Sequence, residues 1–119
     1  MTSPLRLAGP GSPASWLARC RDLDRDRVLR LLAEVDANGL GFSLTVDRVY
    51  RLTGARNGVR VDADDQLAVT ALIGAGVLVP GRGDWLDVDA WPPRDYVLTL
   101  FISATAGRTF YAELRGGER

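Results

Sequence analysis

The sequence predicts a mainly α-helical domain with one small β-hairpin. Apolar residues recur at helical spacing in several segments, and capping residues bound these segments. Two short apolar segments, 77–80 and 85–88, flank four turn-prone residues and predict the hairpin. The chain has 119 residues, of which 46% are hydrophobic, and this length suits one domain with a single core.

The N-terminal region predicts an arm followed by a short helix. Residues 1–13 contain three Pro and two Gly and few apolar residues, so we expect a flexible arm. Trp16, Cys20 and Leu23 lie at i, i+4 and i+7, which places them on one helical face. Cys20 is therefore predicted to be a buried structural thiol.

The second predicted helix has both a start and a stop signal. Asp24 is its expected N-cap, and the Asn38-Gly39 pair ends it because Gly accepts the positive φ of a helix C-cap. Its apolar stripe consists of Val28, Leu31, Leu32 and Val35.

Two further helices are expected in the central region. After an extended or turn-like segment at 41–44, Thr45 can cap a helix over 45–52, and a polar loop follows at 55–61. The carboxylates at 62–65 suit the positive end of a helix dipole and predict a helix over 64–75. The buried stripe of this helix is expected to be Leu67, Ala68, Ala71, Leu72 and Ala75.

The C-terminal region allows two interpretations. Residues 96–102 have high β propensity, and alternation at 110–114 would suit a returning strand, which together would make a C-terminal β-hairpin. Pro93 and Gly116 instead bracket the segment with a helix start and a helix stop. We predict one long helix over 96–114, with the hairpin as the alternative.

In the predicted hairpin, Leu86 and Val88 point inward and Trp85 and Asp87 outward. The order of three helices and a hairpin over residues 26–89 resembles the winged helix-turn-helix superfamily of bacterial and phage type. The segment Leu-Ala-Val-Thr-Ala-Leu-Ile-Gly-Ala-Gly-Val-Leu-Val, the Gly-rich turn and Trp-Leu-Asp-Val carry the resemblance.

The resemblance implies a positioning helix at 45–52, a recognition helix at 64–75 and a wing tip at 81–84. It also implies binding to duplex DNA, by dimers joined through an extra terminal helix. The expected organisation is an arm at 1–13, a winged-helix domain with an extra N-terminal helix at 14–91, and a dimerisation or packing segment at 92–119. A homodimer is accordingly predicted.

The charged residues limit the chemistry that the chain can perform. All 15 basic residues are Arg, 12 of the 15 acids are Asp, and Lys and His are absent, a composition typical of a GC-rich bacterial or phage genome. Without His, the commonest general base and metal ligand is missing, so we predict no enzyme activity, no metal and no cofactor. The longest apolar stretch, 67–80, is too short to cross a bilayer, and no secretory signal is visible, which predicts a cytoplasmic protein.

The zero net charge is divided unevenly along the chain. Residues 41–61 hold four Arg and one acid, whereas residues 62–95 hold two Arg and seven acids. Arg side chains suit phosphate binding, because each neutralised phosphate releases counterions. Arg48 and Arg51 would share one face of the predicted helix. The predicted DNA contacts are Arg48, Arg51, Arg56, Arg60 and Arg82 for phosphates, and Gln66 and Thr70 for bases.

The favoured function is therefore a small non-catalytic DNA-binding protein, either a transcriptional regulator or an accessory factor of a phage or mobile element. The alternative is a protein-binding module, such as a regulator or a phage-encoded inhibitor, whose acidic surface meets a basic partner. The acidic surface would consist of Asp62, Asp64, Asp65, Asp84, Asp87 and Asp89.

Overall fold

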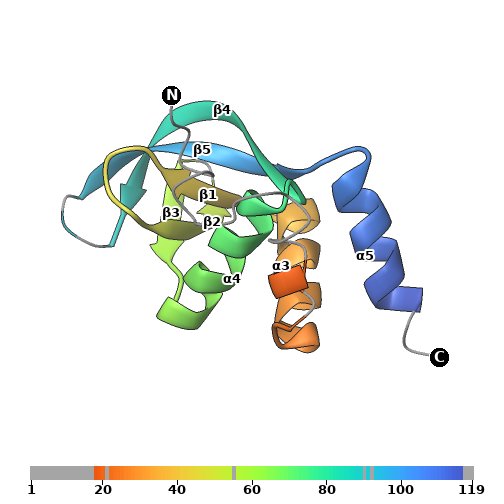
Figure 1. Ribbon diagram of the computed structural model, residues 1–119. Helices are drawn as coiled ribbons and strands as arrows, with labels where there is room; N and C mark the ends of the chain where they lie inside the picture. The colour runs from red at the N-terminus through yellow and green to blue at the C-terminus, as the bar shows by residue number, and fades with distance from the viewer. Residues whose placement is uncertain (1–17, 21, 55, 90, 92, 117–119) are drawn as a thin grey trace, which may run out of the picture.

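A closed five-stranded β-barrel with helices on one side forms the fold (Figure 1). The computed structural model describes residues 18–20, 22–54, 56–89, 91 and 93–116. Its elements, in chain order, are α3 (Arg25–Ala37), β1 (Leu40–Ser43), β2 (Val49–Gly54), β3 (Asn57–Arg60), α4 (Ala63–Gly74), β4 (Leu78–Val88), β5 (Arg94–Ile102) and α5 (Ala106–Gly116).

The barrel closes in the order β1-β2-β3-β4-β5, and β5 returns to β1. All neighbouring strands are antiparallel except β3 and β4, which run parallel through the pairs 57–87 and 58–88. A parallel pair needs a crossover connection, and α4 supplies it. The pairing of Gly41 with Thr99 closes the barrel between β1 and β5.

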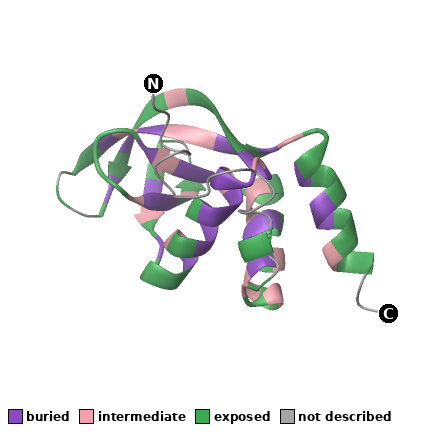
Figure 2. Ribbon diagram, in the orientation of Figure 1, coloured by how far each residue is buried: buried purple, intermediate pink, exposed green. Residues whose placement is uncertain are grey.

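Two apolar cores lie on the two faces of this sheet. The interior of the barrel holds Tyr50, Leu52, Leu86, Val88 and Val97. The larger core lies between the barrel and the helices, and it includes Leu31, Leu32, Leu40, Val49, Leu72, Leu78, Leu100 and Phe110. Successive side chains of a strand point to opposite faces, so the neighbours Val49 and Tyr50 serve different cores. Figure 2 shows where the buried residues lie along the helices and strands.

The prediction of a mainly α fold is wrong, because this is a mixed α/β fold. The predicted helix at 45–52 is a turn followed by β2, and the predicted loop at 55–61 contains β3. Val46, Val49 and Tyr50 fit a helical period, yet the period arises from a strand whose two faces are both buried at Val49 and Tyr50. The positioning helix of the winged-helix resemblance is therefore absent, and the fold does not follow that resemblance.

The predicted hairpin at 77–88 is also wrong, because these residues form one long strand. Between Pro80 and Gly83 the register with β5 shifts, so β4 carries a bulge where a turn was expected. A bulge takes the same Gly-rich chemistry as a turn and bends the strand. The side-chain orientation was predicted correctly: Leu86 and Val88 are buried, and Trp85 and Asp87 are exposed.

The helix predicted over 96–114 is wrong, because β5 fills its first part and α5 its last. The alternative hairpin identified β5, but its returning strand is the helix α5. Residues 96–102 are apolar without a clear period because they contribute to two cores: Val97 enters the barrel interior, whereas Leu100 and Ile102 lie under the helices. The helical basis for a homodimer is thus removed, and dimerisation stays a prediction.

The capping prediction for α3 is confirmed, and so is the position of carboxylates at the start of α4. The Asp24 carboxylate accepts from the backbone N–H groups of residues 26 and 27, and the Asp62 carboxylate accepts from that of Asp65. Gly39 and Gly76 adopt φ of 102° and 77° after the two helices. Along α4 the expected stripe is buried except for Leu67, which is 67% exposed.

The short helix predicted in the N-terminal region is only partly described by the structure. Residues 18–20 are helical, whereas the predicted arm at 1–13 and Trp16 lie outside the described residues.

Among the helices of the described part, none has the length and apolar character needed to cross a membrane.

Candidate nucleic-acid interface

A buried carboxylate organises one end of the barrel. Asp95, the second residue of β5, accepts hydrogen bonds on Oδ1 from Ser43 Oγ at 3.0 Å and from Thr45 Oγ1 at 2.6 Å. Its Oδ2 accepts from the Tyr50 hydroxyl at 2.8 Å. These donors come from the end of β1, the following turn and β2, so one side chain ties together three parts of the chain that lie about 50 residues away in sequence.

Hydrogen bonds keep this carboxylate ionised. Burial raises the pKa of Asp95, but the bonds from Thr45, Tyr50 and Ser43, with the backbone N–H of residue 96, outweigh burial and leave the pKa below its usual value. The pKa of Tyr50 is raised, first by burial and then by its bond to Asp95, against a lowering contribution from Arg48. The Tyr50 hydroxyl therefore keeps its proton and donates a hydrogen bond to the carboxylate.

The Asp95 network is a structural clamp. Ser43, Tyr50 and Asp95 are 2%, 0% and 1% exposed, so a substrate has no access to them. The Ser43 hydroxyl also accepts from the backbone N–H groups of Thr45 and Val46 at 3.1 and 3.0 Å, which fixes the turn between β1 and β2. The network thereby fixes the backbone that carries Arg48.

Three of the predicted site residues come together at this end of the barrel. Nη1 of Arg48 donates to the Tyr50 hydroxyl at 3.5 Å, and Arg60 lies directly across from Tyr50 in the β2–β3 register. Nε2 of Gln66, on α4, donates to the backbone carbonyl of Asp47 at 2.8 Å. A groove of about 440 Å³ lies beside them and is lined by Arg60, Val61, Asp62, Ala63, Gln66 and Leu67.

The remaining predicted contacts are dispersed. Arg51 is exposed on the outer face of β2, the face that also carries Val49. Arg48 precedes this strand and is bonded to Tyr50, which points to the opposite face. The shared helical face predicted for the two Arg residues is therefore wrong. Arg56 occupies the β2–β3 turn with a left-handed φ of 63°. Arg82 lies in the β4 bulge, and Thr70 is exposed on α4.

The predicted acidic surface is divided into two parts. At the start of α4, Asp65 is buried and accepts hydrogen bonds from both Arg27 and Arg30 of α3. Arg27 also lies 3.6 Å from Asp62 and 3.8 Å from Asp64. These three carboxylates thus join α4 to α3. The other part, Asp84, Asp87 and Asp89, is exposed on and beside β4.

Four Arg residues of the barrel lack such partners. Within the described residues, the side chains of Arg51, Arg56, Arg60 and Arg82 form no ion pair and no hydrogen bond. By contrast, Arg108 is paired with Asp36 at 2.9 Å between α5 and α3. The Arg–Asp pairs thus join the helices to one another. The strand pair β2–β3 with its turn, residues 49–60, stays basic, and we call it the β2–β3 ribbon.

Sequence reasoning missed two clusters. The Asp95 network gave one weak signal, a single acid at the start of an apolar segment. The second cluster is aromatic: Trp85 lies directly across from Tyr96, with ring centroids 5.3 Å apart at an interplanar angle of 68°, and Cζ of Arg94 lies 5.6 Å from the Trp85 ring centre. The prediction placed Trp85 outward but placed Tyr96 in a helical segment.

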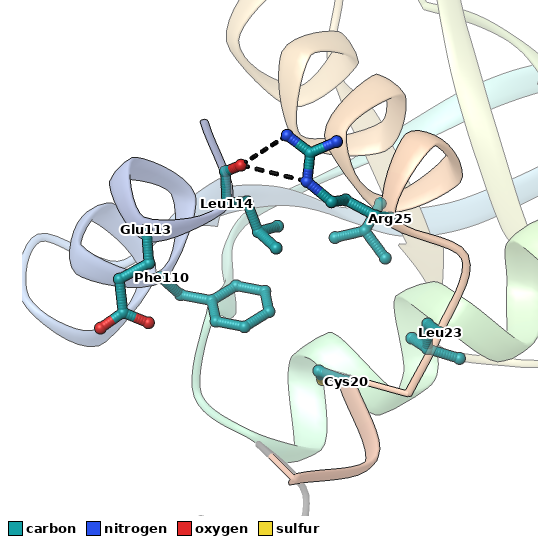
Figure 3. Close-up of a pocket in the computed structure, with 7 residues that line it drawn as sticks. Cys20, Leu23, Arg25, Phe110, Glu113 and Leu114 are labelled. Carbon is teal, nitrogen blue, oxygen red and sulfur yellow. Dashed lines mark hydrogen bonds between the residues drawn. The ribbon is translucent and has the colours of Figure 1, made fainter. Parts of the chain in front are cut away.

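A further pocket lies between α3 and α5 and has a volume of about 260 Å³ (Figure 3). Arg25 Nε and Nη2 donate to the backbone carbonyl of Leu114, at 3.2 and 2.8 Å, and so hold the end of α5. Cys20 lines this pocket and is buried, as predicted. Among the described residues, no group of three or more His, Cys, Asp or Glu side chains is placed to hold a metal ion.

Comparisons with protein families, with curated proteins and with solved structures find no match to this chain.

Proposed function

We propose that this protein binds nucleic acid without catalysis, and that Arg51, Arg56 and Arg60 of the β2–β3 ribbon contact phosphates. One observation carries the proposal. These exposed guanidinium groups have no carboxylate partner within the described part of the chain, although the protein contains as many acids as bases. An unpaired cationic ribbon is the electrostatic feature that phosphate binding requires.

The arrangement of the acids supports the same proposal. The carboxylates at the start of α4 would repel phosphates if they were unpaired. Arg27 and Arg30 bind the buried Asp65, however, and Arg27 also lies beside Asp62 and Asp64. The Asp95 clamp holds Arg48 at the same end of the barrel as Arg60. Phosphates can therefore approach Arg48 and Arg60 together at this end of the barrel.

Base contacts by α4 have less support than phosphate contacts by the ribbon. The Gln66 amide group is already bonded to the Asp47 carbonyl, and half of the residues of α4 are buried, with α3 and β4 as its neighbours. The proposal accordingly rests on the Arg side chains, which suits a regulator or accessory factor of low sequence selectivity.

Fluorescence anisotropy with labelled oligonucleotides tests the proposal. We expect the affinity to fall steeply between about 50 and 200 mM salt, because phosphate contacts release counterions. The double variant R56A/R60A should bind more weakly and should reduce the log–log salt slope by about 1.4 on a single strand, at about 0.7 for each lost contact.

A charge-matched control separates the ribbon from net charge. The variant R108A/R115A removes the same two charges from α5 and should leave affinity and slope unchanged. Binding that is absent or insensitive to salt would contradict the proposal. So would equal losses in the two double variants, because net charge alone would then explain the binding.

A further inference from the structure

Trp85 forms a rigid exposed aromatic platform on the outer face of the barrel. It lies in β4 and is 49% exposed, with Tyr96 of β5 directly across from it. The Tyr96 side chain packs against Gly83, where a Cβ atom would come within 2.6 Å of the ring. Because Gly83 has no side chain, Tyr96 can pack down onto β4 and support Trp85 edge-on.

Cationic groups lie on both sides of this platform. On one side is Arg94, whose Nε is 3.7 Å from Asp87 Oδ1; both side chains are more than 60% exposed, so this pair contributes little and can exchange for a phosphate. On the other side, the backbone carbonyl of Arg56 accepts from the N–H of Asp87 at 2.8 Å. This bond fixes the basic β2–β3 turn against β4, two residues from Trp85.

A shallow groove of about 340 Å³ continues from this turn along the outer face of β3. Thr53, Val59 and Asp87 are among its lining residues. Asp84 and Asp87 disfavour phosphates along β4 itself, whereas Arg56 in the β2–β3 turn and Arg94 at the start of β5 lie on either side of this strand. A bound strand would thus keep its phosphates beside these two Arg residues and turn a base toward Trp85.

We propose that the outer face of β4 and β5 binds single-stranded nucleic acid, with a base stacked on Trp85 and the adjoining phosphates held by Arg56 and Arg94. This inference rests on the proposed function and names its ligand. An unpaired strand is required because the faces of its bases are available to an aromatic ring, whereas bases inside a duplex are stacked on one another. Stacking on one aromatic residue tolerates any base, which agrees with the lack of a base-reading helix.

The test compares two ligands of equal charge. Anisotropy titrations use oligothymidylate of about twelve nucleotides and an abasic deoxyribose-phosphate strand of the same length. This length is within the range that small barrel domains cover on a single strand. We expect oligothymidylate to bind about 5- to 150-fold more tightly, as one stacked base implies. The variant W85A should abolish this preference, and W85F should retain most of it because a ring remains.

Phe101 supplies the matched control. It is 50% exposed on β5, near the other end of the same strand pair, and packs over Gly81 as Tyr96 packs over Gly83. F101A should therefore lose a comparable cross-strand contact but keep the preference for oligothymidylate. Thermal unfolding of each variant establishes that it is folded at the assay temperature.

The outcomes separate the two proposals. Equal affinity for the two strands, with intact salt dependence, would overturn stacking and leave phosphate binding in place. Tighter binding to a duplex than to oligothymidylate, or a preference that survives in W85A, would also overturn the inference. Absence of binding to every ligand would refute the proposed function and, with it, this inference.

Discussion

Replacing Tyr50 by Phe removes one hydroxyl from the Asp95 clamp and keeps the ring in the barrel interior. The lost bond is 2.8 Å long and runs to an ionised carboxylate oxygen that is buried from solvent. A hydrogen bond to a charged group contributes about 1.5–3 kcal/mol to the free energy of unfolding. For a chain of this size that corresponds to a fall in Tm of about 6–12 °C, at about 4 °C per kcal/mol.

The assay is urea unfolding at neutral pH, followed by circular dichroism, with Y111F as the control. Tyr111 is also a buried residue of an apolar core, but its hydroxyl forms no hydrogen bond within the described residues. Y111F should therefore change the free energy of unfolding by less than about 0.5 kcal/mol. If Y50F and Y111F were equally mild, the Asp95 clamp would not contribute the stability assigned to it.

The same clamp predicts a dependence on pH. The pKa of Asp95 is lower in the folded protein than in the unfolded chain, so its contribution is present above an unfolded pKa of about 3.9 and is lost as pH falls through the folded value. Y50F raises the folded pKa by removing a donor to the carboxylate. The acid-unfolding midpoint of Y50F should move to higher pH than that of the parent protein and Y111F.

Two further stability predictions concern the helices. D65N should cost about 1–3 kcal/mol, because the buried carboxylate bonds two Arg side chains, whereas D64N should cost less than about 0.5 kcal/mol; urea unfolding of the two variants would show no difference if the Arg pairs were unimportant. G107A should destabilise by about 1–3 kcal/mol, because its Cβ would lie 2.3 Å from the Val77 carbonyl oxygen. G116A meets open space at the end of α5 and should be neutral in thermal unfolding, so equal effects would contradict the packing argument.

Local signals predicted α3 and α4, since each has a capping Asp and a positive-φ Gly close in sequence. The barrel was not predictable in the same way, because its strands are defined by partners far along the chain. In β5, apolar residues serve two cores on opposite faces, and the result has no clear period. The segment around Gly81 has the composition of a turn, and only its pairing with β5 makes it a bulge.

The candidate site was also predictable only where its residues are close in sequence. Charge counting along the chain located the basic ribbon, including Arg56 and Arg60, because neighbouring residues of one hairpin remain neighbours in space. It did not find Trp85 with Tyr96, or Asp95 with Ser43, since those contacts depend on strand register. The pairing of Asp65 with Arg27 and Arg30 was hidden for the same reason, and it changed the expected acidic surface into an internal joint.

Closure of the barrel limits how any partner can attach. Each of the five strands has a neighbour on both sides, but β3 pairs with β4 only at 57–87 and 58–88, so most of β4 has no strand partner on that side among the described residues. A peptide or a second copy of this chain could add a strand by β-augmentation only along such a stretch. Elsewhere on the barrel, recognition and homodimerisation have to use side chains on the surface.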